Sequence, residues 1–94
     1  MEMNIMATML IQHQIKDFDT WKQVFDSAHD LRTSNGEQSY QIYQSTDDPN
    51  YITGVFTWDS LDHAKSFANS SELKEAMGKA GVVGAPSILY LDEI

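Results

Sequence analysis

The sequence predicts an α+β protein of the ferredoxin-like type, with the element order β-α-β-β-α-β. Four stretches are predicted to be strands, and the period-two alternation that strands require is clearest in the first of them. These stretches are 5–15, 40–45, 51–58 and 87–91. Apolar side chains recur at helical spacing in two further stretches, 21–31 and 61–80. We therefore expect a four-stranded antiparallel sheet with both helices on one face.

The chain has 94 residues, which is the usual size of one domain. It contains no internal repeat, no linker and no low-complexity segment. Residues 1–94 are therefore expected to form a single ferredoxin-like domain.

The first strand is expected over 5–15, with its apolar side directed toward the helices. That side carries Ile5, Ala7, Met9, Ile11, His13 and Ile15. The first helix follows, with Asp19 or Thr20 as the expected N-cap, because a side-chain oxygen there accepts an unpaired backbone N–H. Asn35-Gly36 is expected to end it, since both residues tolerate a positive φ.

The second and third strands are expected to form a hairpin around the turn at 47–50, where Pro49 presets φ. The second helical stretch begins at Asp59 or Ser60, is interrupted at 69–71, and begins again at Ser70 or Ser71. Gly81 is expected to end it, followed by a loop at 84–86 and the last strand.

With both helices on one face, the opposite face of the sheet is left bare. It is expected to carry part of the fourth strand together with Thr8, Leu10, Gln12, Thr53, Val55 and Thr57. No charged residue interrupts the first three strands as predicted, and a monomer rarely exposes so apolar a face. We expect a homodimer that packs these faces together. The alternative is a monomer with a moderately polar exposed face.

The charges exclude several partners. The chain has 6 Lys+Arg against 14 Asp+Glu, a net charge of −8, whereas nucleic acid and anionic membrane surfaces attract basic proteins. There is no cysteine, so disulfides, thiolate nucleophiles and cysteine-based metal sites are excluded. No stretch approaches the apolar length of a membrane span, and the start lacks the pattern of a signal peptide. We expect a cytoplasmic protein.

Two segments resemble a known superfamily. They are Trp21-Lys22-x-x-Phe25-Asp26 and the run from Phe56 through Trp58-Asp59-Ser60 to Leu73-Lys74-x-Ala76-Met77. Together with the element order, they resemble the dimeric α/β-barrel superfamily and, within it, small proteins of the antibiotic-biosynthesis-monooxygenase and cyclase type. The resemblance implies a dimer with a pocket between sheet and helices in each subunit. It also implies oxygenase or cyclase activity without a cofactor.

The haem-degrading branch of this superfamily is a poor match. That branch is known for a histidine ligand at the end of the last helix and a tryptophan within the second helix. This chain has Met77 and Phe67 at the matching positions, so the resemblance does not imply haem.

His13 is the first candidate catalytic residue. It follows Met9 and Ile11 on the side of the first strand that faces the helices. A histidine in an apolar pocket titrates near neutral pH and is able to move protons. The alternative is a core histidine whose nitrogens are satisfied by neighbouring groups.

Other side chains are candidates for holding a substrate. Tyr40, Tyr43 and Tyr90 offer hydroxyl groups to a carbonyl or enolate, and we select Tyr40 and Tyr90 as catalytic candidates, with ordinary strand packing as the alternative. The aromatic candidates that would wall a ligand are Trp58, Phe56 and Phe67. Arg32, the only arginine, is a candidate for an anionic group, with stabilisation of the helix C-terminus as the alternative.

No metal site is expected. Asp59 and His63 share a helix face, but two ligands at one spacing are a weak signal, and His29 lies among polar positions. The sequence thus favours a homodimer that binds a compact aromatic, quinol or polyketide-like molecule and, if catalytic, acts without metal or flavin. The alternative is a non-enzymatic ligand-binding or assembly module whose pocket is filled by its own side chains.

Overall fold

A computed structural model describes residues 6–94 of the chain. The elements are β1 (Ala7–Ile15), α1 (Phe18–Ser27), α2 (His29–Ser34), β2 (Glu37–Gln44), β3 (Tyr51–Trp58), α3 (Leu61–Ala68), α4 (Ser71–Ala80) and β4 (Val82–Leu91). The predicted α+β ferredoxin-like fold is confirmed, with each predicted helical stretch divided into two helices. Ile5, which we expected in the first strand, lies outside the described residues.

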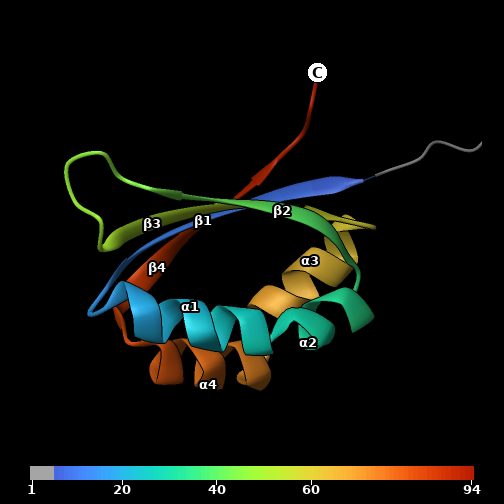
Figure 1. Cartoon of the computed structure of the whole chain (residues 1–94). Coiled ribbons are helices and arrows are strands. Elements are labelled where there is room, and N and C mark those ends of the chain that lie inside the picture. Colours follow the sequence, from blue (N-terminus) through green and yellow to red (C-terminus); the bar gives the residue numbers. More distant parts are fainter. Residues whose placement is uncertain (1–5) are drawn as a thin grey trace, which may run out of the picture.

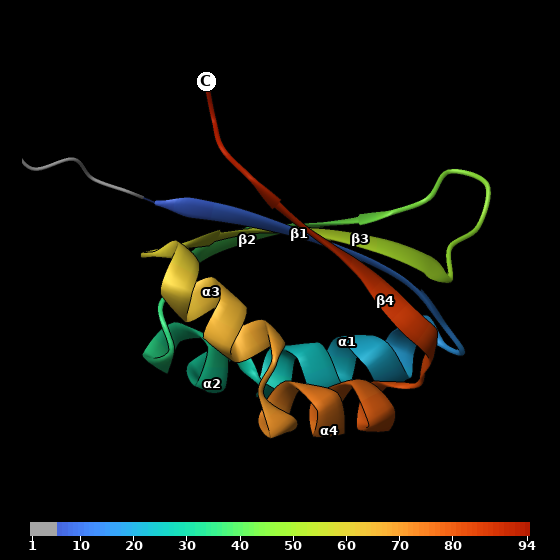
Figure 2. The same cartoon turned by 180° about the vertical axis from the view of Figure 1, so that it is seen from behind.

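The four strands form one antiparallel sheet in the order β2-β3-β1-β4. All four helices lie on one side of this sheet, which leaves its other side uncovered (Figure 1; Figure 2). We call the uncovered side the outer face. The functional candidates of β1 and β3 therefore face a single layer of helices.

The alternation predicted for the first strand is confirmed. Along β1 the odd-numbered residues from Ala7 to Ile15 are buried and the even-numbered ones are half-buried. His13 lies in the buried set, opposite Ile52 of β3. It therefore points toward the helices, as its place in the alternation predicts.

The first helical stretch differs from the prediction in two ways. Asp17, rather than Asp19 or Thr20, is the N-cap, and its carboxylate accepts the backbone N–H of Thr20 at 2.9 Å. That hydrogen bond lowers the pKa of Asp17. The stretch also breaks at Ala28, although neither glycine nor proline marks the position.

The caps of the second helical stretch follow the prediction. Ser60 caps α3 and Ser70 caps α4, in each case by accepting a backbone N–H three residues on. Gly81 ends α4 with φ 81°, in the left-handed region that glycine adopts without strain.

Two strands begin earlier than predicted. The second strand starts at Glu37 rather than at residue 40, and the fourth starts at Val82 rather than at residue 87. The expected loop at 84–86 is thus part of a strand, which pairs with β1 across an irregularity between Gln12 and Gln14. The glycine and proline there mark this irregularity and not a loop.

The outer face is predominantly uncharged, as expected. Leu10 of β1 lies between Val55 of β3 and Leu89 of β4, and all three are on this face. Gln12 donates a hydrogen bond to Thr53 at 3.1 Å across two strands. Glu37, the charged residue that the earlier start of β2 adds, is buried against Arg32 on the helix side.

The described part of the chain, residues 6–94, contains no helix of the length and apolar character that crossing a membrane requires.

Candidate active site

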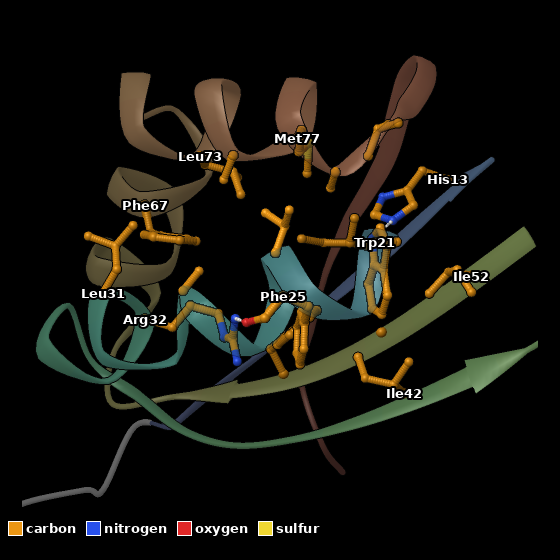
Figure 3. A pocket seen from close by; sticks show the side chains of 18 of the residues that line it. His13, Trp21, Phe25, Leu31, Arg32, Ile42, Ile52, Phe67, Leu73 and Met77 are labelled. Carbon is orange, nitrogen blue, oxygen red and sulfur yellow. Dashed lines mark hydrogen bonds between the residues drawn. The ribbon is translucent and has the colours of Figure 1, made fainter. Parts of the chain in front are cut away.

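A cavity of about 70 Å³ lies between the helix side of the sheet and the helices. Its lining is almost entirely apolar and includes residues of every strand and every helix. His13 and Trp21 lie at one end of the lining, and Arg32, Leu31 and Phe67 lie at the other (Figure 3). Ligand sites usually measure roughly 300–1,000 Å³, so a ring enters only if lining side chains move.

The lining side chains that are only half-buried are found mainly on the helices. Val24 and Leu31 come from α1 and α2, and Leu73 and Met77 come from α4. The cavity is therefore less completely shielded on its helix side than on its sheet side. Met77 is the side chain best suited to move, because an unbranched thioether adapts readily to a ligand.

His13 is held by Trp21. The indole Nε1–H of Trp21 donates a hydrogen bond to Nε2 of His13 at 3.0 Å, and the rings are 6.0 Å apart. An indole nitrogen only donates, so Nε2 of His13 must be the unprotonated nitrogen. In the neutral ring the proton then resides on Nδ1, which is buried and has no hydrogen-bond partner within residues 6–94. His13 thus presents an N–H donor.

Burial lowers the pKa of His13 below its ordinary value, because desolvation disfavours the charged ring. The imidazole is therefore neutral at pH 7. To act as a base, it would have to release the Trp21 hydrogen bond or shift its proton. The geometry favours donation of a hydrogen bond to a bound oxygen.

The depressed pKa predicts a pH dependence of folding. Below about pH 6.5 His13 is protonated in the unfolded chain but not in the folded protein, whose His13 has the lower pKa. The free energy of unfolding therefore decreases as the pH is lowered. The loss is complete below the folded pKa, and its slope reaches at most about 1.4 kcal/mol per pH unit. Urea unfolding from pH 7.5 to 5 should show a shallower fall for His13→Gln than for the wild type. His29, His63 and Glu37 are common to both proteins, so superimposable pH curves would contradict the prediction.

Arg32 and Glu37 form a buried ion pair beside the cavity. Nε of Arg32 lies 2.8 Å from Oε2 of Glu37, and Nη1 donates to the carbonyl oxygen of Phe25 at 2.7 Å. The guanidinium carbon lies 3.7 Å from the centre of the Phe25 ring. Arg32 therefore does more than stabilise a helix end, which was the alternative drawn from the sequence.

The charge of Arg32 is already matched by Glu37. Burial raises the pKa of the Glu37 carboxyl, while the charge and hydrogen bond of Arg32 oppose that rise. Nη2 of Arg32 remains buried without a hydrogen-bond partner among residues 6–94. Arg32, a residue of the cavity lining, thus keeps one buried N–H group without a partner in this part of the chain, while its charge is matched by Glu37.

Trp58 supplies a third donor of the same kind. It is fully buried at 0% exposure, its ring centre lies 5.1 Å from that of Phe67 with the planes tilted by 35°, and it lines the cavity. Its indole Nε1 has no hydrogen-bond partner in the described part of the chain. Phe56 and Phe67 line the same cavity, so the predicted aromatic wall is assembled.

The predicted tyrosines lie elsewhere. Tyr40 is 40% exposed and packs edge-on against Phe25, and Tyr90 is 37% exposed with Lys65 near its ring. Neither lines the cavity, and Tyr43 is on the exposed outer side of β2. The structure therefore does not bring Tyr40 or Tyr90 together with His13, and the catalytic role predicted for them has no support from their positions.

Trp21 and Glu37 are functional candidates that the sequence did not reveal. Trp21 reads as an ordinary member of the apolar helix stripe, and nothing local links it to His13 across the intervening turn. Glu37 lies just ahead of the predicted second strand and reads as a loop residue. Only the folded chain shows that both hold a cavity donor in place.

No cluster of three or more potential metal ligands occurs within residues 6–94. Asp59 and His63 are in contact, with Oδ1 and Nδ1 2.8 Å apart. The pair is exposed, and neither residue lines the apolar cavity. His29 is exposed, as expected.

Residues 4–79 match the family described as Antibiotic biosynthesis monooxygenase. No curated protein sequence matches the chain. Among solved structures, a Bordetella bronchiseptica protein assigned to the antibiotic biosynthesis monooxygenases is similar in fold. It is 15% identical, with a TM-score of 0.81, and the match covers 95% of this chain and 97% of that one.

Two further structures carry more specific descriptions. SnoaB, a cofactor-independent oxygenase from Streptomyces nogalater, is 10% identical, with a TM-score of 0.73 and 96% of each chain covered. The monooxygenase from the gene ActVA-Orf6 of Streptomyces coelicolor, in complex with nanaomycin D, is 16% identical, with a TM-score of 0.68. That match covers 97% of this chain and 89% of that one. At these identities the structures establish the fold, and the sequence match establishes that the chain belongs to the antibiotic biosynthesis monooxygenase family.

Proposed function

We propose that the protein is a homodimeric, cofactor-independent oxygenase acting on a compact aromatic, quinol or polyketide-like molecule. The observation that carries the proposal is the apolar cavity with its aromatic wall, whose lining residues include three with a buried N–H group that has no partner among residues 6–94. Such donors stabilise negative charge on a substrate oxygen in a dry site. Family membership and the similarity to SnoaB and the ActVA-Orf6 monooxygenase support the same class of reaction.

The proposed reaction takes its electrons from the substrate. The substrate gives up one proton of an activated ring CH₂ to solvent water and binds as the enolate, whose carbon reacts with O₂. One oxygen atom becomes the new C=O group, and the other leaves as water with the two hydrogens of the carbon. His13 holds the developing oxyanion through Nδ1–H. The role that the sequence suggested for a tyrosine hydroxyl passes in this proposal to Arg32 and Trp58.

The test is oxygen uptake by the purified protein with anthrone and a panel of naphthols and naphthalenediols. We expect uptake faster than the spontaneous reaction for at least one compound, with one atom of labelled O₂ in the product. Binding without any acceleration would instead support a non-enzymatic ligand-binding module. The small cavity is the observation that favours this second candidate, because a site of about 70 Å³ is largely filled by its own side chains.

The proposed dimer rests on the outer face. Leu89 is 49% exposed beside the half-buried Leu10 and Val55, and no helix covers them (Figure 2). A second copy that packs the same face would remove this apolar surface from water. The two cavities would then lie on the far sides of the paired sheets.

Leu89→Lys is therefore expected to shift the protein from dimer to monomer, because it places a charge in the proposed interface. Light scattering on a sizing column at micromolar concentration would measure the mass. Leu61→Lys is the matched control, since Leu61 is 38% exposed on α3 and lies on the helix side. A wild-type monomer, or an Leu89→Lys dimer, would contradict the proposed interface.

A further inference from the structure

An open groove lies next to the cavity, and we call it the α4–β4 groove. It has a volume of about 290 Å³ and lies between β4 on one side and α4 with the end of α3 on the other. Besides two residues that it shares with the cavity, its lining consists of Ala68, Asn69, Ser70, Lys74, Pro86 and Ile88. The groove is several times larger than the cavity, and the reaction proposed above gives it no part.

Two side chains of α4 separate this groove from the cavity. Leu73 and Met77 line both hollows, and they lie on the same side of the helix because they are four positions apart. Figure 3 shows both side chains reaching from α4 toward the middle of the cavity. The other α4 residues in the cavity lining, Ala76 and Ala80, are small. Leu73 and Met77 therefore form most of the wall that α4 places between cavity and groove.

The sheet also brings the two hollows close together. Ile11 of β1 lines the cavity, Ile88 of β4 lines the groove, and these two residues are paired across neighbouring strands. Neighbouring strands lie about 4.8 Å apart, so a single strand spacing separates the cavity from the groove on the sheet side. A movement of side chains on α4 would therefore join them.

The wall formed by Leu73 and Met77 is able to open. Both side chains are half-buried and pack against the edge of the core. The unbranched thioether of Met77 changes its conformation readily. Val24 and Leu31 are half-buried lining residues on α1 and α2, but they do not line the α4–β4 groove. An opening at Leu73 and Met77 thus leads into a groove that already exists.

We propose that ring-shaped ligands enter the cavity through the α4–β4 groove and that Leu73 and Met77 form the gate. The proposal rests on the cavity being the site of the proposed function, and it adds the route by which a substrate reaches that site. The cavity of about 70 Å³ is then the closed state. A ligand takes up the space that Met77 gives up as it moves into the groove, so Met77 limits the size of the ring that enters.

A single cysteine inside the cavity tests the route, because the chain has no cysteine of its own. Ile11→Cys places a thiol in the lining, and its reaction with benzyl methanethiosulfonate is followed by mass spectrometry of the full chain. We expect Met77→Ala in this background to raise the labelling rate at least about ten-fold, since the reagent no longer has to displace a packed side chain. Val24→Ala is the matched control and should change the rate much less, because Val24 is also half-buried in the lining but does not line the groove.

Filling the groove from outside gives a second test, in which a loss of stability cannot imitate the expected result. Lys74 is exposed and lines the groove, so Lys74→Trp should slow the labelling of Ile11→Cys by at least about three-fold. Lys79→Trp makes the same change at an exposed position of the same helix that lines neither hollow, and it should leave the rate unaltered.

Urea unfolding of each variant gives the part of the labelling that passes through global unfolding. The proposal would be overturned if all labelling occurred at that rate, or if Val24→Ala accelerated it as much as Met77→Ala. An unchanged rate in Lys74→Trp would overturn it as well.

The labelling measures access and not catalysis. A protein whose gate responds as expected but that consumes no oxygen would retain the route and lose the proposed oxygenase activity. An active oxygenase whose cavity thiol reacts at a rate independent of Met77 and Lys74 would retain the activity and lose the route.

Discussion

Replacing His13 by phenylalanine is expected to lower kcat/KM by about 10²–10³-fold, the usual cost of removing one donor from an oxyanion site. The substitution keeps a ring in the cavity and removes Nδ1–H, which is buried and unpaired among the described residues. Oxygen uptake with the best compound of the panel measures the effect. His13→Gln should restore part of the activity, because its amide retains an N–H donor.

Two controls separate this role from stability. His63→Phe alters an exposed histidine on α3 and should leave kcat/KM within a factor of two or so. Trp21→Phe removes the indole that holds His13, so it should lower kcat/KM and change the pH profile by freeing Nε2 to accept a proton. A fully active His13→Phe enzyme would remove His13 from the proposed site.

Arg32→Met is expected to lower the free energy of unfolding by about 3–5 kcal/mol, because it leaves the buried Glu37 carboxylate without its partner. This loss of stability should become smaller toward acidic pH, because protonation of the Glu37 carboxyl removes the unpaired buried charge. Urea unfolding at pH 7 and pH 5 would measure both effects.

The double variant Arg32→Met/Glu37→Leu should recover much of the loss, since apolar groups of similar volume replace both charges. Lys22→Met is the matched control, because it breaks the exposed Lys22–Asp26 pair, whose expected worth is about 0.5 kcal/mol or less. If Arg32→Met lowered the free energy of unfolding no more than Lys22→Met does, the Arg32–Glu37 pair would not stabilise the fold as expected.

The features that were predictable from the sequence are those that local patterns determine. The period of two along 7–15 depends only on which side of the strand is buried, and it correctly directed His13 toward the helices. Ser60 and Ser70 begin their helices by accepting a backbone N–H three residues on, and Gly81 ends its helix by adopting a positive φ. Each of these signals lies within a few residues of the helix end.

Two of the errors arose where contacts beyond the repeating pattern decide the local structure. The helix break at Ala28 carries no glycine or proline, and it coincides with the point where Arg32 binds the carbonyl oxygen of Phe25. The early start of β2 at Glu37 likewise depends on pairing with Trp58, which lies 21 positions away in the chain. Such contacts leave no periodic signal in the sequence.

The site was predictable in part for the same reason. Aromatic residues on the inner side of the strands, such as Phe56 and Trp58, had to face the helices, and they line the cavity. The tyrosines were chosen for their hydroxyl groups. Tyr40 and Tyr90 belong to the two edge strands, β2 and β4, where the helices cover the sheet less completely. The position of the His13 proton on Nδ1 follows only once Trp21 is seen to occupy Nε2.

The most direct test of the proposed site is the response of the two indole N–H signals in a ¹⁵N–¹H correlation spectrum as anthrone is added. The chain has two tryptophans, so both signals can be assigned with Trp58→Phe. We expect the Trp58 signal to move downfield as the Trp58 N–H, unpaired among residues 6–94, binds the carbonyl oxygen. The Trp21 signal should move much less, because the Trp21 N–H already binds His13. An unmoved Trp58 signal, with changes confined to the outer face around Leu10 and Leu89, would contradict it.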